Sequence, residues 1–117
     1  MLLVYGIPNC DTVRKARKWL EARNIAHSFI NFRKTPLDPA DVARWVGQLG
    51  SKPMRNTSGG AYRALPEDKK QWSEDRWAVA IAEEPMLLKR PLIVRNDTAL
   101  MAGFRGTDAD ITLALGV

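Results

Sequence analysis

The chain has 117 residues, of which 45% are hydrophobic and 26% charged, proportions that are ordinary for a globular protein and exclude collagen-like, disordered and coiled-coil classes. Its net charge of +5 suits either nucleic acid or a small anionic substrate. The charges are spread along the chain, and no RNA-binding motif, zinc finger or helix-turn-helix is visible, so we do not expect nucleic-acid binding. With one cysteine and one histidine we expect no internal disulfide, no metal site and no bound cofactor.

The length, the apolar runs and the cysteine count also predict the cellular compartment and the number of domains. No apolar run reaches the length of a membrane span, and no charged segment precedes the short apolar run 2–5. We therefore expect neither a signal peptide nor a membrane partner. A chain with one unpaired thiol suits a reducing compartment, which predicts a cytoplasmic location. At this length, residues 1–117 are expected to form one domain.

The first predicted elements are a strand over residues 2–5 and a helix over residues 11–24. The strand is apolar and ends in a turn that contains glycine and proline. The helix carries apolar residues at Val13, Ala16 and Leu20, a spacing that places one face on a core. Asn24 is a plausible stop.

Cys10 lies in the turn between these two elements, at the N-terminus of the predicted helix. Unpaired backbone N–H groups and the positive end of the helix dipole stabilise a thiolate there. The same groups could instead bind an oxyanion, although a single glycine is too few for a nucleotide phosphate loop. The alternative is that Cys10 is only a small buried hydrophobic residue.

The next elements are a strand over residues 25–32, a loop over 33–36, and a helix capped by Asp38 and ended by Gly50. His27 could act as a general base for Cys10, but a surface position at the far end of its strand is the expected reading.

Residues 51–88 differ from the rest and predict an α-helical insertion, with a helix over 73–84. The loop 56–60 is rich in turn-forming residues and is either a plain surface loop or an anion-binding loop.

The C-terminal part predicts a strand over 92–94, a turn at 96–97, a partner strand over 98–102 and a last helix. That helix is capped by Thr107 or Asp108 and runs through Leu115. The whole chain is thus predicted to be α/β, with a βαβ half, a helical insertion and a ββα half.

Several segments together resemble the ArsC/Spx/YffB family, most nearly its YffB branch. They are residues 5–12 (Tyr-Gly-Ile-Pro-Asn-Cys-Asp-Thr) with the Arg-Lys-Ala and Trp-Leu that follow, residues 89–94 (Lys-Arg-Pro-Leu-Ile-Val) and residues 101–104 (Met-Ala-Gly-Phe). The resemblance spans nearly the whole chain. It implies a thioredoxin-like fold in which both halves share one sheet.

The resemblance also implies functional residues. Cys10 matches the nucleophile, and Arg90 matches an arginine that helps to bind an oxyanion before a cis-proline, here Pro91. Arg105 is the nearest candidate for a second arginine after the final strand. Around the thiol we expect Asn9, Asp11 and Thr12 to bind substrate or glutathione through their N–H groups, although the Asp11 carboxylate works against a thiolate. Arg14, one turn after Cys10, either faces the thiol or points to water.

Two positions depart from the ArsC pattern, and a third departs from the Spx pattern. ArsC enzymes carry a histidine four residues before the cysteine, where this chain has Gly6. They carry an arginine in the middle loop, where the direct match is Asn56, with Arg55 beside it. A Cys-x-x-Cys motif, usual in Spx regulators, would need cysteine where this chain has Val13.

These residues favour a monothiol reductase of the ArsC type that depends on glutathione, with a glutaredoxin as a candidate partner, because Cys10 has no resolving thiol in the chain. Its substrate would be a small anion or thiol. One alternative is an Spx-like regulator that docks on RNA polymerase or another protein. A further alternative is a glutaredoxin-coupled arsenate reductase, which Gly6 and Asn56 disfavour.

Overall fold

A computed structural model describes all residues 1–117, and they form two compact units. One unit combines Met1–Pro36 with Arg90–Val117, and the other is Leu37–Lys89. The second unit begins before the predicted insertion, because the helix after Asp38 belongs to it. That residues 1–117 act as one domain stays a prediction. No helix in either unit is long and apolar enough to cross a membrane.

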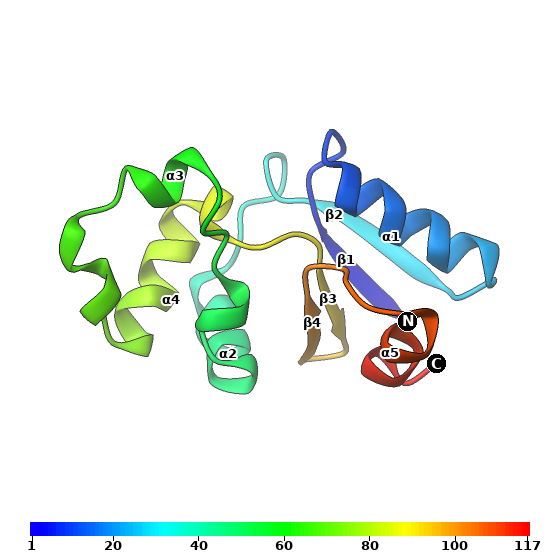
Figure 1. The fold of residues 1–117 in the computed structure, drawn as a ribbon. Helices are drawn as coiled ribbons and strands as arrows, with labels where there is room; N and C mark the ends of the chain where they lie inside the picture. The colour runs from blue at the N-terminus through cyan, green and yellow to red at the C-terminus, as the bar shows by residue number, and fades with distance from the viewer. The chain divides into compact units, whose positions relative to one another are not determined.

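The first unit is built on a four-stranded mixed sheet (Figure 1). The strands β1 (Leu2–Gly6), β2 (His27–Asn31), β3 (Leu92–Arg95) and β4 (Thr98–Ala102) lie in the order β2-β1-β3-β4. β1 pairs parallel with β2 and antiparallel with β3, and β3 pairs antiparallel with β4. The βαβ and ββα halves therefore share one sheet, and the predicted thioredoxin-like α/β fold is confirmed.

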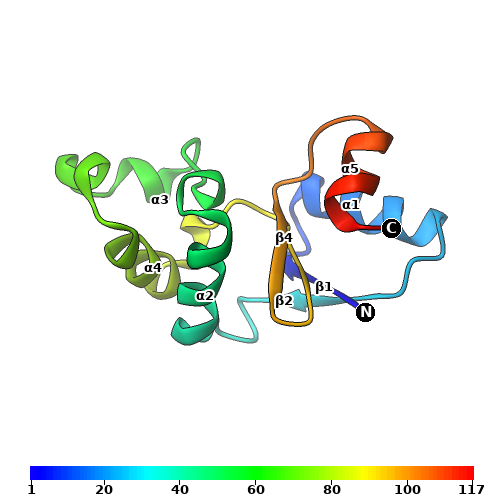
Figure 2. The ribbon, with the colours of Figure 1, turned by 90° about the horizontal axis from the view of Figure 1, so that it is seen from below.

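Two helices, α1 (Asp11–Ala22) and α5 (Asp108–Leu115), pack on the same face of this sheet (Figure 2). The predicted apolar face of α1 is confirmed, because its three apolar residues are fully buried. The core between the sheet and the two helices consists of Leu2, Val4, Ala16, Leu20, Ile93, Phe104, Ile111 and Leu115.

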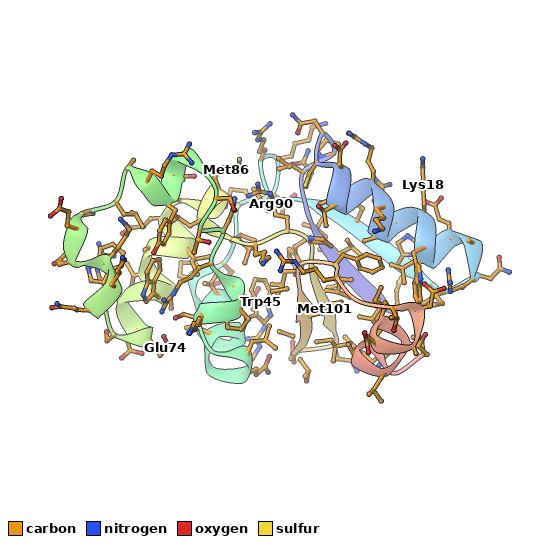
Figure 3. The ribbon with its side chains drawn as sticks, in the orientation of Figure 1. Lys18, Trp45, Glu74, Met86, Arg90 and Met101 are labelled. Carbon is orange, nitrogen blue, oxygen red and sulfur yellow. The ribbon has the colours of Figure 1, made fainter.

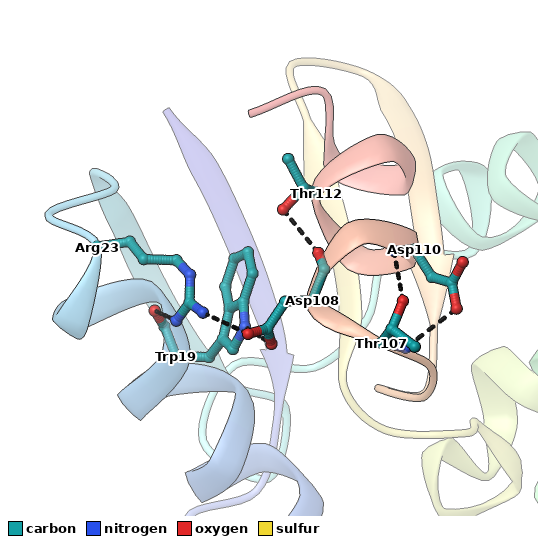
Figure 4. Close-up of polar contacts among 6 residues, drawn as sticks. All are labelled: Trp19, Arg23, Thr107, Asp108, Asp110 and Thr112. Carbon is teal, nitrogen blue, oxygen red and sulfur yellow. Dashed lines mark hydrogen bonds and ion pairs between the residues drawn. The ribbon is translucent and has the colours of Figure 1, made fainter.

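Asp108 also joins α1 to α5 through polar contacts (Figure 4). The indole N–H of Trp19 donates to one carboxylate oxygen of Asp108 at 2.9 Å. The guanidinium of Arg23 pairs with the other oxygen at 3.0 Å and stacks on the Trp19 ring. At the start of α5, Thr107 and Asp110 form a reciprocal capping box, so Thr107 rather than Asp108 is the cap.

Element ends differ from the prediction by a few residues. α1 ends at Ala22 instead of Asn24, and Asn24 then takes a left-handed conformation with φ 55°, which asparagine tolerates in a turn. The second strand runs over His27–Asn31, shorter than the predicted 25–32. The turn between β3 and β4 is confirmed, with Asn96 at φ 55°.

The second unit is helical and contains α2 (Pro39–Leu49), α3 (Gly60–Arg63) and α4 (Glu74–Glu83). Three 3-10 helices, Lys52–Met54, Glu67–Gln71 and Pro85–Leu87, connect them, and neither these nor α3 was predicted. The predicted caps of α2 are confirmed, since Asp38 accepts a hydrogen bond from the N–H of Ala40 and Gly50 has a φ of 79°. α2 and α4 pack together, with Trp45 and Trp77 fully buried.

A buried hydroxyl organises the segment that follows α2. Ser51 is fully buried, and its hydroxyl donates to the carboxylate of Glu74 while accepting from Arg55 Nη2 at 2.6 Å. The backbone N–H of Ser51 donates to the other Glu74 oxygen at 2.7 Å. The hydrogen bonds from Ser51, and secondarily the charge of Arg55, hold the pKa of Glu74 below its usual range.

Candidate active site around Cys10

Strand register brings four segments of the first unit to one end of the sheet. Gly6, the last residue of β1, pairs with Asn31, the last residue of the parallel strand β2. On the other side of β1, Tyr5 pairs with Leu92, the first residue of β3. Leu92 in turn pairs with Ala102 at the end of β4. The turn that carries Cys10, the loop after β2, the Arg90–Pro91 step and the loop after β4 therefore leave the sheet at the same end.

Cys10 is the N-cap residue of α1 and is half-buried. Its backbone is extended, with φ −113° and ψ 123°, and its carbonyl accepts the first helical hydrogen bond, from Arg14 N–H at 3.0 Å. The side chain makes no capping hydrogen bond, although serine, threonine or aspartate at this position usually does. The sulfur is therefore placed at the positive end of α1 without being committed to the backbone. The predicted position of Cys10 at the helix N-terminus is confirmed.

Arg14 points back toward the turn that holds Cys10. Its guanidinium forms an ion pair with Asp11 and donates to the carbonyl oxygen of Pro8 at 3.2 Å. These two contacts hold the two sides of the turn together. The positive charge of Arg14 also offsets the negative charge of Asp11, which is unfavourable for a thiolate at Cys10. Of the other residues predicted around the thiol, Asn9 is exposed and Thr12 is half-buried.

The Arg90–Pro91 peptide bond is cis, as the resemblance implied. Pro91 is buried and its carbonyl accepts from the N–H of Gly103 at 2.9 Å, which ties the start of β3 to the end of β4. Arg90 is half-buried on the segment that leads into β3 (Figure 3). Arg105 is exposed in the loop after β4. Both arginines thus lie on segments that adjoin the end of the sheet that carries Cys10. Their roles in binding substrate stay predictions.

The side chain of Val13 packs against the backbone of Gly6, where ArsC enzymes carry a histidine. A Cβ atom at Gly6 would lie 2.7 Å from one methyl carbon of Val13 and 3.4 Å from the other, closer than side-chain carbons normally approach. Val13 is fully buried, so it cannot move out into solvent. With valine in its present position at residue 13, a side chain at position 6 would overlap it, so a histidine there would require Val13 or β1 to shift.

Asn56 and Arg55 belong to the second unit. The guanidinium of Arg55 is engaged with Ser51 and Glu74, and its carbon Cζ lies 4.2 Å from the Trp77 ring centroid. Arg55 therefore has a structural role that its position beside Asn56 did not reveal. Asn56 is half-buried, and its backbone N–H donates to the carbonyl of Leu87 at 2.8 Å. A part for Asn56 in anion binding stays a prediction.

His27 begins β2 and pairs with Leu2, at the opposite end of the sheet from the Cys10 turn. Its Nδ1 lies 2.8 Å from the carbonyl oxygen of Ile25. The position agrees with the expected reading and gives His27 no access to the thiol. No group of three or more histidine, cysteine, aspartate or glutamate side chains is placed to hold a metal ion.

Further basic residues, which no sequence pattern singled out, lie at this end of the sheet or on α1. Arg33 and Lys34 are exposed in the loop after β2, which follows the residue paired with Gly6. Arg17 on α1 is half-buried, and its guanidinium stacks on the Phe29 ring of β2. The parallel pairing of β1 with β2 was the signal that could have placed the loop over residues 33–36 near Cys10.

Comparison with known proteins agrees with this geometry. A model of the ArsC family matches residues 5–109. The chain belongs to the ArsC family. An uncharacterized protein of Haemophilus influenzae is 38% identical, over 86% of this chain and 90% of its own length. A solved structure named YffB protein is 28% identical, with a TM-score of 0.84 and 97% of each chain covered.

Relatives of two functional kinds are similar to this ArsC-family chain. A protein named arsenate reductase, from Neisseria meningitidis, is 29% identical over 82% of this chain and 85% of its own length. A protein named global transcriptional regulator Spx, from Streptococcus agalactiae, is 27% identical over 80% of this chain and 70% of its own length. Membership of the family is therefore compatible with either a reductase or a regulatory role.

Proposed function

We propose that this ArsC-family chain is a monothiol reductase that uses glutathione, with Cys10 as its nucleophile. The observation that carries the proposal is the placement of Cys10: it caps α1, its sulfur makes no capping hydrogen bond, and the Arg90–Pro91 step leaves the sheet at the same end. The similarity to a protein named arsenate reductase supports an oxidoreductase in general terms.

The proposed reaction is thiol–disulfide exchange. The Cys10 thiolate attacks one sulfur of a disulfide substrate, forms a mixed disulfide and releases the other sulfur as a thiolate. The chain has no second cysteine to resolve this intermediate. A glutathione thiolate therefore attacks the substrate sulfur, which frees Cys10 and leaves a disulfide between glutathione and the substrate. A glutaredoxin is the expected partner that reduces this product.

Each neighbouring group has a part in this proposal. The N–H groups of the first turn of α1 stabilise the Cys10 thiolate and any anionic oxygen next to it. Arg90 and Arg105 supply positive charge for an anionic substrate. Arg14 holds the turn through Pro8 and Asp11, so it acts on Cys10 by positioning the turn.

The test is the reduction of hydroxyethyl disulfide by glutathione, measured with the wild-type chain and with Cys10→Ser. We expect Cys10→Ser to lose the activity entirely, because no other thiol can form the mixed disulfide. Circular dichroism and thermal unfolding of the variant check that the fold is kept. Equal activity in the two proteins would overturn the proposal.

A second candidate is an Spx-like regulator that binds a protein partner, and the similarity to proteins named Spx favours it. Val13 removes the second cysteine of a redox switch but leaves a docking role open. This candidate predicts that Cys10→Ser keeps the full affinity of the wild-type chain for RNA polymerase, while the wild-type chain shows no disulfide exchange. Arsenate reduction, a further candidate, would share Cys10 and Arg90 and would appear as oxidation of glutathione that depends on added arsenate.

A further inference from the structure

One side of α1 carries a basic pocket to which the proposed reaction assigns no ligand. The pocket has a volume of about 180 Å³ and is lined by Arg14, Arg17, Lys18 and Glu21. Arg14 lies three and four residues before Arg17 and Lys18, and Glu21 lies four and three residues after them, so the four residues form one stripe along the helix. Cys10 stands four residues before Arg14, which places the candidate nucleophile at the N-terminal end of the same stripe.

The charges in this pocket are not all engaged with the protein. Arg14 is paired with Asp11. The guanidinium carbon of Arg17 lies 4.3 Å from the centroid of the Phe29 ring of β2, and its Nε is buried without a hydrogen-bond partner. Because Nε is covered, a ligand in the pocket would contact the terminal nitrogens of the Arg17 guanidinium, whose plane is held against the Phe29 ring. Lys18 is exposed on α1 and adds a second cation, which outnumbers the single carboxylate of Glu21 (Figure 3).

The distance from Cys10 to these cations matches the reach of a tripeptide thiol. At a rise of about 1.5 Å per residue, Arg17 and Lys18 lie roughly 10 and 12 Å along the helix from Cys10. A disulfide joins Cα atoms about 5.5–6 Å apart. One further extended residue adds about 3.5 Å to its Cα, and its terminal carboxylate extends beyond that. A carboxylate of glutathione bound to Cys10 can therefore reach Arg17 and Lys18.

We infer that Arg17 and Lys18 form the carboxylate-binding subsite for glutathione, on the flank of α1. This inference rests on the proposed function, since it names the part of α1 that recognises the thiol co-substrate. Arg17, held flat on Phe29, donates hydrogen bonds to the carboxylate in a fixed orientation, and Lys18 adds a second positive charge. In the exchange with glutathione disulfide, the Cys10 thiolate forms a bond to one sulfur, the sulfur–sulfur bond of the reagent breaks, and a glutathione thiolate leaves.

The first measurement is the rate at which Cys10 becomes glutathionylated by glutathione disulfide, followed by mass spectrometry. The variants are Arg17→Ala, Lys18→Ala, their combination, and the matched control Lys15→Ala, which removes the same charge from the same helix outside the pocket. An exposed charge pair changes such a rate about two- to fivefold, so the double variant should react about fivefold or more slowly than wild type at low salt. The rate of glutathionylation of Lys15→Ala should stay within about twofold of the wild-type rate. Hydroxyethyl disulfide has no carboxylate, so Cys10 should react with it at the same rate in all variants.

The second measurement does not depend on the reactivity of Cys10. S-methylglutathione cannot exchange, and its dissociation constant from calorimetry should rise about fivefold or more in the double variant but not in Lys15→Ala. If the wild-type chain binds S-methylglutathione in this way yet never reacts with a disulfide, the proposed function fails and the subsite stands. If the pocket variants match Lys15→Ala in both measurements, the subsite is overturned. The subsite is also overturned if the pocket variants exchange more slowly with an acidic protein disulfide but not with glutathione disulfide, because that result would assign the pocket to a protein partner.

Discussion

Placing a methyl group at Gly6 tests how closely β1 and α1 approach beside the candidate nucleophile. The new Cβ would lie 2.7 Å from a methyl carbon of Val13, well inside the 3.4 Å at which ordinary contact begins. Val13 is fully buried and Gly6 is also buried, so the added volume cannot be accommodated by a shift into solvent. Overpacking of this kind costs about 1–3 kcal/mol of stability.

Removing the opposing side chain should remove most of that cost. Val13→Ala alone deletes two buried methyl groups and should lower the free energy of unfolding by about 2 kcal/mol. In that background Gly6→Ala meets no Val13 methyl group, and the loss of backbone freedom in the unfolded chain favours alanine by about 0.4–1 kcal/mol. The double-mutant cycle should therefore give a favourable coupling of about 1–3 kcal/mol.

The assay is urea unfolding of the four proteins in the cycle, followed by circular dichroism. Gly47→Ala is the control, because a Cβ there meets nothing within 4 Å and the residue lies inside α2, where alanine is favoured over glycine by roughly 0.5–1 kcal/mol. A Gly6→Ala cost below about 0.5 kcal/mol, or the same cost with and without Val13, would refute the reasoning.

Two further predictions concern stability. Glu74→Gln should lower the free energy of unfolding at pH 7 by roughly 0.5–1 kcal/mol, because the carboxylate accepts two hydrogen bonds from Ser51 but is partly exposed. Since the pKa of Glu74 is lowered by folding, its contribution is complete above the usual glutamate value of about 4.3 and is lost as pH falls through the folded value, so wild type and variant should converge in acid. Persistent separation of the two unfolding curves at low pH would contradict this. Thr107→Ala should cost about 1 kcal/mol by removing the cap of α5, with Thr98→Ala as an exposed control; an equal effect of both changes would argue against the capping box.

The parts of the fold that could be predicted from sequence are those decided by local signals. Apolar spacing identified α1, and the Asp38-Pro39 pair with Gly50 identified both ends of α2. The second unit was harder, because its 3-10 helices are too short to show a periodic pattern and depend on tertiary contacts. Ser51 illustrates this: its burial depends on Glu74, a partner 23 residues away that no local pattern indicates.

The candidate site was predictable where one segment carried it. Cys10 and Arg14 follow from the turn and the start of α1, although the ion pair of Arg14 with Asp11 required coordinates. The convergence of Arg90 and Arg105 on the same end of the sheet depends on antiparallel pairing over long separations, which the resemblance implied and composition could not show. Arg17 was missed because a charged helix face looks the same in sequence whether it is solvated or stacked on an aromatic ring.

The central claim, that Cys10 is an activated thiol beside an anion site, is tested most directly by its rate of alkylation with iodoacetamide at neutral pH. Cys10 is the only cysteine, so every alkylated molecule reports on it, and the same chain unfolded in urea supplies the reference. We predict that the folded chain reacts faster than the unfolded chain, because the thiolate is the reacting species, and that added arsenate or S-methylglutathione slows the reaction. Equal rates in the folded and unfolded chains, with no response to either anion, would contradict the claim.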